Sequence, residues 1–157
     1  MTRRSSCTGR LRAATVEDIA QLLPLWALLF DEDVDRGQSW RGHARSWFGE
    51  AVSDREMACF PVIAVDDVIV ATAVGTLERG IPNPSCPRGR TVRLANVVTV
   101  PEHRGHGHGT RLVQHVVAWA GSVGADRVDL SATSDGRRIY ERAGFVLTSA
   151  PRMKLVL

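Results

Sequence analysis

The chain has 157 residues, of which 44% are hydrophobic and 24% charged, and its net charge is +3. This composition is typical of a soluble globular domain and argues against a fibrous or disordered protein. The basic residues are spread along the chain and do not cluster with aromatic residues, so we expect no nucleic-acid partner. We also expect no membrane partner, because no segment has the length and apolar character of a bilayer span.

Cysteine usage and the N-terminal segment indicate the compartment. The chain has three cysteines with no C-x-x-C spacing, which argues against a disulfide framework and against a zinc knuckle. The first residues are charged but no apolar stretch follows them, so we expect no export signal and a cytoplasmic location. Residues 1–9 are small and polar and are expected to form a disordered tail, followed by one domain over residues 10–157.

The first expected elements are a short strand and a helix. Residues 10–14 suit a strand, and Thr15 can cap a helix whose first turn is acidic. The helix is expected to run to about Phe30, and Pro24 should kink or divide it. Its apolar residues fall on one stripe that we expect in the core: Ile19, Leu22, Leu23, Trp26 and Phe30.

An acidic segment and a second helix follow. Residues 31–35 contain four carboxylates, which indicates either a solvated loop or a negative rim that attracts a cationic amine. A helix is expected over about residues 38–53. We interpret its aromatic side chains as core in preference to pocket wall: Trp40, Trp47 and Phe48.

Two β-rich runs, residues 60–65 and 68–77, are separated by the dipeptide Asp66-Asp67. This pattern predicts an antiparallel hairpin with both strands buried. Residues 79–89 are rich in glycine and proline, which predicts a long irregular loop. Such a loop could shape an acceptor pocket or serve as a mobile connector.

The most informative stretch joins a strand, a glycine-rich turn and a helix without a break. Residues 92–100 have the Val, Leu and Thr content of a buried strand, which should end at the proline that follows. Glycine then occupies every second position, at Gly105, Gly107 and Gly109, and apolar residues at helical spacing begin after Thr110. The first turn of a helix has unpaired N–H groups and a positive dipole end, so this stretch predicts an anion site.

Spacing discriminates between the known phosphate-binding loops. A Walker loop ends in Gly-Lys-Ser or Gly-Lys-Thr, but the only lysine of this chain is Lys154. The dinucleotide fingerprint G-x-G-x-x-G is not matched, because the third glycine comes one residue early. The pattern that fits is R-x-x-G-x-G, formed by Arg104, Gly107 and Gly109.

A second motif lies downstream. Residues 128–132 suit a strand, and Tyr140 then begins the sequence Tyr-Glu-Arg-Ala-Gly-Phe. Together with R-x-x-G-x-G, this Tyr-x-x-x-Gly-Phe segment resembles the GNAT superfamily of acyl-CoA-dependent N-acyltransferases, over about residues 10–157. The elements expected in this half are a strand over residues 127–132, a helix from Ser134-Asp135 to Ala143, and strands over residues 145–148 and 152–157.

The order of elements favours an α/β class, and the resemblance implies an α/β (α+β) single-domain GNAT fold with a mixed central β-sheet flanked by helices. It also implies acetyl-CoA as co-substrate and a primary amine of a small molecule or peptide as acceptor. The residues that it places against acetyl-CoA are Val97, Val98, Thr99, Arg104, Gly105, His106, Gly107, His108, Gly109, Thr110 and Thr133. The sequence departs from the family pattern at His106 and His108, where smaller or aliphatic residues are common, and at Thr133, where many relatives have Asn.

Catalysis in such a fold needs a donor for the thioester oxyanion, a base for the amine and an acid for the departing thiolate. The resemblance assigns the first role to the backbone N–H of Val98. We choose Glu78 as the base, with the carboxylates of residues 31–33 acting through water as alternatives. Tyr140, the only tyrosine, aligns with the family's tyrosine near the acyl-CoA sulfur and is the candidate acid, with a packed aromatic residue as the alternative.

Histidines near the glycine turn raise the question of a metal site: His103, His106, His108 and His115. No cysteine or carboxylate completes a known ligand spacing with them, so we expect no metal. The alternative to an enzyme is a module that holds acyl-CoA without catalysis, as a sensor or a partner subunit. A homodimer stays open in either case.

Overall fold

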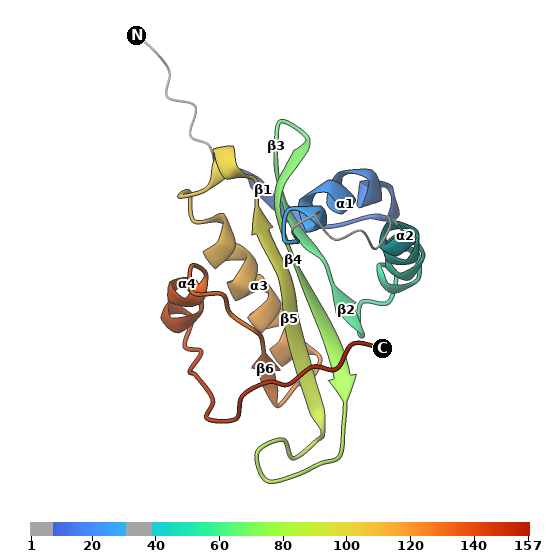
Figure 1. Ribbon diagram of the computed structural model, residues 1–157. Helices are drawn as coiled ribbons and strands as arrows, with labels where there is room; N and C mark the ends of the chain where they lie inside the picture. Colours follow the sequence, from blue (N-terminus) through green and yellow to red (C-terminus); the bar gives the residue numbers. More distant parts are fainter. Residues whose placement is uncertain (1–7, 31–38) are drawn as a thin grey trace.

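The computed structural model of the chain describes residues 8–30 and 39–157. A mixed sheet has the strand order β1-β3-β4-β5-β6, with β2 paired to β4, and helices lie against both of its faces (Figure 1). The expected α/β (α+β) fold with a mixed central sheet is confirmed. The elements are β1 (Arg10–Ala13), α1 (Ile19–Ala27), α2 (Ser39–Ala51), β2 (Ala58–Cys59), β3 (Pro61–Val65), β4 (Val68–Arg79), β5 (Arg90–Thr99), α3 (His108–Ser122), β6 (Arg127–Asp129) and α4 (Arg137–Arg142).

The sheet separates two hydrophobic cores. On one face α1 and α2 pack through residues that include Leu22 and Phe48, and on the other face α3 packs through residues that include Leu112 and Val116. Each helix therefore buries one apolar side against the sheet, as its sequence spacing requires. None of the described helices is long and apolar enough to cross a bilayer.

One carboxylate holds the start of the described chain. Asp18 accepts hydrogen bonds from both terminal nitrogens of Arg12, at 2.7 and 2.9 Å, and from the backbone N–H of Thr15 at 2.8 Å. The hydrogen bond from Arg12 lowers the pKa of Asp18, against the opposing effect of burial. Thr15 is the predicted cap, although a short 3-10 turn (Val16–Asp18) precedes α1.

The end of α1 differs from the prediction. The helix ends at Ala27 and contains Pro24 without a break, so the proline does not divide it. Most of the predicted apolar stripe is buried: Ile19, Leu22, Leu23 and Trp26. Phe30 lies beyond the helix and is 59% exposed, and its assignment to the core was therefore wrong.

The aromatic residues of α2 divide between core and surface. Phe48 is fully buried and packs edge to face against Trp26 and Phe60, with ring centroids 5.9 and 5.0 Å apart. Trp40 and Trp47 are partly exposed, and the Trp47 ring packs against Phe60 at 5.5 Å. The prediction of core positions is therefore confirmed for Phe48 alone.

The predicted hairpin is confirmed as antiparallel β3 and β4. Its two turn residues, Asp66 and Asp67, have φ angles of 50° and 64°. Positive φ at both central residues is what a two-residue hairpin needs to match the twist of its strands, and aspartate adopts it more readily than most residues.

The expected irregular connection between β4 and β5 is also confirmed, and Asp126 anchors it. This carboxylate accepts hydrogen bonds from the backbone N–H and Nε of Arg88, both at 2.9 Å, and from the Arg90 backbone N–H and the Cys86 thiol, both at 3.3 Å. The Arg88 side chain and these backbone donors lower the pKa of Asp126 to about 2. The connection is thus fastened to the turn that precedes β6.

The C-terminal part departs most from the prediction. β6 has only residues Arg127–Asp129, and α4 begins at Arg137 with Gly136 as its cap, later than Ser134-Asp135. Residues 145–157 form no strand, so the predicted strands over residues 145–148 and 152–157 are wrong. A strand needs the free edge of a neighbour, whereas this segment runs across the front of β5 and β6 in Figure 1.

Candidate functional site

The site begins where two parallel strands separate. Residues Thr91–Arg93 of β5 pair with Arg127–Asp129 of β6. After these pairs β6 ends, whereas β5 continues to Thr99. Among the described residues, no strand pairs with residues 94–99 of β5 on this side. A groove of about 680 Å³ opens there, between residues 94–99, the glycine turn and α4. Its volume lies in the range of small-molecule sites.

Asn96 gives the floor of this groove an irregular backbone. Its φ angle is 51°, and the register against β4 shifts by one residue between Thr72 and Val74. This is a β-bulge, which reverses the alternation of side chains along the strand. Leu94 consequently lies in the core beneath α3, whereas Val98, four residues on, lies in the core beneath α1 and α2.

The glycine turn has the geometry of an anion site. Gly105 and Gly107 both have φ angles of 78°, and Gly107 is the N-cap residue of α3. The first helical hydrogen bond is donated by the Arg111 N–H to the Gly107 carbonyl at 3.1 Å. Within the described part of the chain, the backbone N–H groups of residues 105–110 have no backbone acceptor. They are available to an anion, as the sequence predicted.

Two side chains fix the shape of this turn. Arg104 donates from Nε to the Thr99 carbonyl at 3.1 Å, which ties the turn to the end of β5. His106 Nδ1 lies 3.0 Å from the His103 carbonyl oxygen. Arg104 also lines the groove, where a phosphate group would be a further partner for its guanidinium.

His108 is the buried polar residue of the turn. It is 2% exposed, and neither of its ring nitrogens has a hydrogen-bond partner among the described residues. Its ring stacks on His106 at 6.0 Å and lies 6.4 Å from the His103 ring. Burial, with the charge of Arg111 and the neighbouring histidines, lowers the pKa of His108 and keeps it neutral. The described residues include no group of three side chains placed to hold a metal.

The opposite wall of the groove comes from α4 and the segment before it. Thr133 Oγ1 accepts a hydrogen bond from the Gly136 N–H at 3.3 Å and so holds the start of α4. Tyr140 lines the groove, and its ring packs edge to face on Phe145 at 6.0 Å. Burial raises the pKa of Tyr140, so its hydroxyl stays protonated at neutral pH and can donate a hydrogen bond.

The groove brings together most of the residues predicted to bind acetyl-CoA: Val97, Val98, Thr99, Arg104, Gly105, Gly107, His108, Gly109, Thr110 and Thr133. His106 lies in the same turn but outside the lining. Tyr140 completes the group. Residues that sequence reasoning missed also line it, among them Leu28, Leu29, Asn96, Ser131 and Arg142. Asn96 was the detectable one, because asparagine is uncommon within a Val-rich strand and tolerates positive φ.

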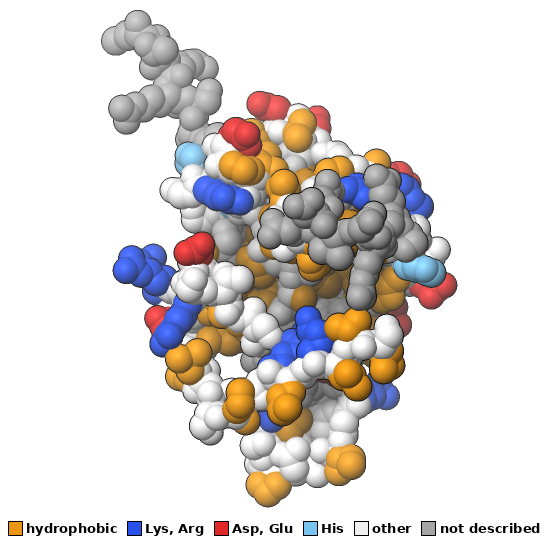
Figure 2. All heavy atoms as spheres, viewed as in Figure 1, with side chains coloured by type: hydrophobic (Ala, Val, Ile, Leu, Met, Phe, Trp, Pro, Cys, Tyr) orange, Lys and Arg blue, Asp and Glu red, His pale blue; other side chains and the backbone are white. Residues whose placement is uncertain are grey.

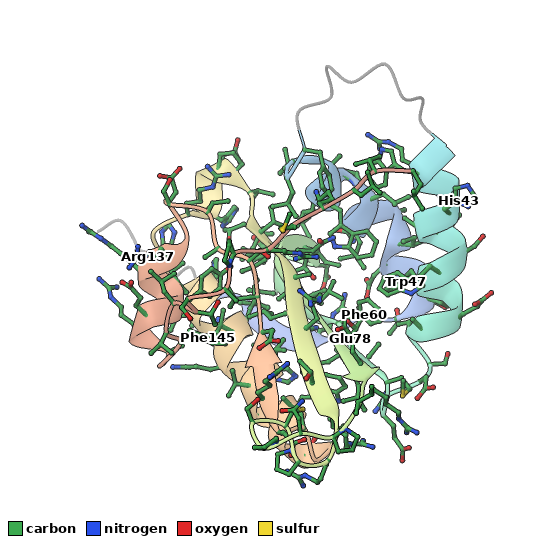
Figure 3. The ribbon with its side chains drawn as sticks, turned by 60° about the horizontal axis from the view of Figure 1, so that its bottom comes forward. His43, Trp47, Phe60, Glu78, Arg137 and Phe145 are labelled. Atoms are coloured by element: carbon green, nitrogen blue, oxygen red, sulfur yellow. The ribbon has the colours of Figure 1, made fainter. Side chains whose placement is uncertain are left out.

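Glu78 is not among the lining residues. It lies near the far end of β4, opposite Thr91, and its carboxylate accepts a hydrogen bond from Nε of Arg93 at 2.9 Å. Figure 3 shows Glu78 on the β4 side of β5, whereas Phe145 lies on the α4 side. The role of Glu78 as a base therefore remains a prediction. The alternative carboxylates, residues 31–33, lie outside the described residues.

Several solved structures that share this fold are named as acetyltransferases. A predicted acetyltransferase from Clostridium acetobutylicum, solved with acetyl-CoA, superimposes with a TM-score of 0.82 at 21% identity, over 94% of this chain and 95% of its own. Glucosamine-6-phosphate N-acetyltransferase from Arabidopsis thaliana superimposes with a TM-score of 0.77 at 20% identity, over 94% of this chain and 98% of its own. A GCN5-related N-acetyltransferase from Ralstonia eutropha superimposes with a TM-score of 0.77 at 20% identity, over 93% of this chain and 97% of its own.

The sequence itself identifies the family. Curated protein sequences gave no match. The profile of the acetyltransferase (GNAT) family, however, matches residues 19–145, which contain the glycine turn, the floor of the groove and Tyr140. Because this match spans most of the chain, the protein belongs to the acetyltransferase (GNAT) family.

Proposed function

We propose that the protein transfers the acetyl group of acetyl-CoA to a primary amine of a small molecule or peptide. The observation that carries this proposal is the groove between the unpaired edge of β5 and α4, which ends at the unpaired N–H groups of the glycine turn. A long ligand with a diphosphate at one end suits this shape, since the turn can hold the diphosphate and the open edge of β5 can pair with amide groups. The Clostridium acetobutylicum relative contains acetyl-CoA.

We assign a group of the chain to each step of the reaction. The amine nitrogen attacks the thioester carbon, and the carbonyl oxygen gains negative charge; the backbone N–H of Val98, a residue that already pairs with Thr72 of β4, would stabilise it as a shared donor. The C–S bond then breaks, and the Tyr140 hydroxyl would donate its proton to the departing thiolate. The amine must lose a proton before or during attack. Glu78 would take it only through water, because its carboxylate is engaged by Arg93 outside the groove.

The direct test is CoA release with a panel of amines. We expect free thiol to appear only when acetyl-CoA and an accepted amine are both present, with the acetylated amine as second product. The protein would instead be a silent acyl-CoA-binding module if acetyl-CoA raised its melting temperature but no amine released CoA. Acetyl-CoA should raise that temperature in either case, because a ligand that binds only the folded state stabilises it.

A further inference from the structure

A second hollow, of about 440 Å³, adjoins the groove. It lies between β6, α4 and the C-terminal segment, and it shares Ser131 and Tyr140 with the groove. A molecule in this hollow would therefore reach the hydroxyl that we place at the acyl-CoA sulfur. The residues that line this hollow include the apolar side chains of Val146 and Leu147, both of which are largely exposed to solvent.

Arginine dominates the charge of this second hollow. Four arginines line it, and three of them are paired with a carboxylate: Arg93 with Glu78 at 2.9 Å, Arg127 with Asp129 at 3.4 Å and Arg137 with Glu141 at 2.5 Å. Figure 2 shows Lys and Arg side chains gathered near the middle of the face where the C-terminal segment crosses the sheet.

Arg152 is the exception. It donates from a terminal nitrogen to the Ser131 hydroxyl at 2.8 Å, and no carboxylate of the described residues pairs with it. The serine hydroxyl is neutral, so no side chain of residues 8–30 and 39–157 offsets the positive charge of the guanidinium. The hydrogen bond to Ser131 positions the Arg152 guanidinium. Because Ser131 lines both the second hollow and the groove, the guanidinium lies where the two meet.

We propose that Arg152 binds an anionic group, a carboxylate or a phosphate, carried by the acceptor amine. This inference rests on the proposed function. A guanidinium presents its N–H donors in a planar fork that matches the oxygens of either group. With the anion at Arg152 and Ser131, the amine nitrogen of a short acceptor points toward Tyr140 and the groove. The second hollow is large enough for such a molecule, and Val146 covers its aliphatic part.

The test compares amines that differ only in the anion. One arm uses 4-aminobutyrate and its amide, and the other uses phosphoethanolamine and ethanolamine, all with saturating acetyl-CoA. We expect the charged member of at least one pair to have a kcat/KM about 10- to 100-fold higher, the range expected for a hydrogen bond to a charged group. The arm that shows the preference identifies the anion as carboxylate or phosphate.

Variants of the C-terminal segment assign the preference to one side chain. Arg152→Met should bring the ratio of kcat/KM close to 1, mainly through KM, and Arg152→Lys should restore part of it. Lys154→Met removes the same charge two residues away and should leave the ratio unchanged. The acetyl-CoA-induced rise in melting temperature should be the same in all variants, which shows that each one folds.

Two outcomes would overturn the inference. If CoA is released but neutral amines are used as well as charged ones, or Arg152→Met keeps the preference, the anion site is wrong and the acetyltransferase function stands. If no amine of either kind releases CoA, both proposals fall together.

Discussion

The two edges of β5 show how one strand can serve two purposes. The edge toward β4 is paired along its length, from Arg79↔Arg90 to Ala71↔Thr99, apart from the bulge. The edge toward β6 is paired only at residues 91–93. Pairing satisfies backbone groups and supports the core, whereas the unpaired stretch leaves them for a ligand. Stability and binding can therefore be perturbed separately.

The largest effect on stability should come from the core between α3 and the sheet. Leu112→Ala removes a fully buried side chain of α3 and should lower the free energy of unfolding by about 2–5 kcal/mol. Denaturant unfolding measures this loss. The folded fraction should still bind acetyl-CoA with its normal Kd. Val117→Ala, on the exposed side of α3, should change stability by only about 0.5 kcal/mol, and an equal loss in both variants would contradict the assignment of this core.

The next effect concerns the unpaired edge and its glycine turn. Gly107→Val puts a branched side chain at a residue with φ of 78° and in front of the free N–H groups, so Kd for acetyl-CoA should rise about 100-fold or more. The strain should cost about 1–2 kcal/mol of stability. Calorimetry gives the Kd. Gly121→Ala, at the other end of α3 with open space around it, is the control. If the valine variant bound acetyl-CoA with the normal Kd, the glycine turn would not be part of the acetyl-CoA site.

A smaller effect is expected for Tyr140→Phe, which keeps the ring that packs on Phe145 and removes only the donor. Loss of general-acid assistance should lower kcat by about tenfold or more, with the Kd for acetyl-CoA unchanged. Rates must be measured where chemistry limits turnover. Full activity would leave Tyr140 as a packing residue.

The smallest effect should be the pH dependence that His108 confers. Burial lowers the pKa of this histidine in the folded protein, whereas in the unfolded chain the pKa has its ordinary value of about 6.5. Below that pH the unfolded state binds a proton that the folded state does not, so stability should decrease as the pH falls. His108→Phe should flatten this dependence by a few degrees of melting temperature between pH 8 and pH 5.5. His43→Gln, at an exposed position of α2, is the control for removing a histidine outside the turn.

What the sequence could predict was set by local chemistry. The Asp66-Asp67 turn, the glycine turn and the start of α3 follow from residues that are neighbours in the chain. The separation of β5 from β6 does not, because it depends on where a distant strand stops. The strands predicted after Phe145 failed because β-propensity alone does not bring a segment to a sheet edge, and residues 145–157 cross the sheet without pairing with its edge strand β6. Glu78 was chosen by its place at a strand end, and only the fold reveals its partner Arg93.

The bulge at Asn96 has a mechanical consequence. The bulge turns the side chains of successive parts of β5 toward opposite faces of the sheet. Beneath the groove, Leu94 therefore packs in the core under α3 and Val98 in the core under α1 and α2. A ligand resting on this stretch restrains the junction between the layers. Acetyl-CoA should consequently slow amide hydrogen exchange in α1 and α3 alike, although the diphosphate would touch only the start of α3.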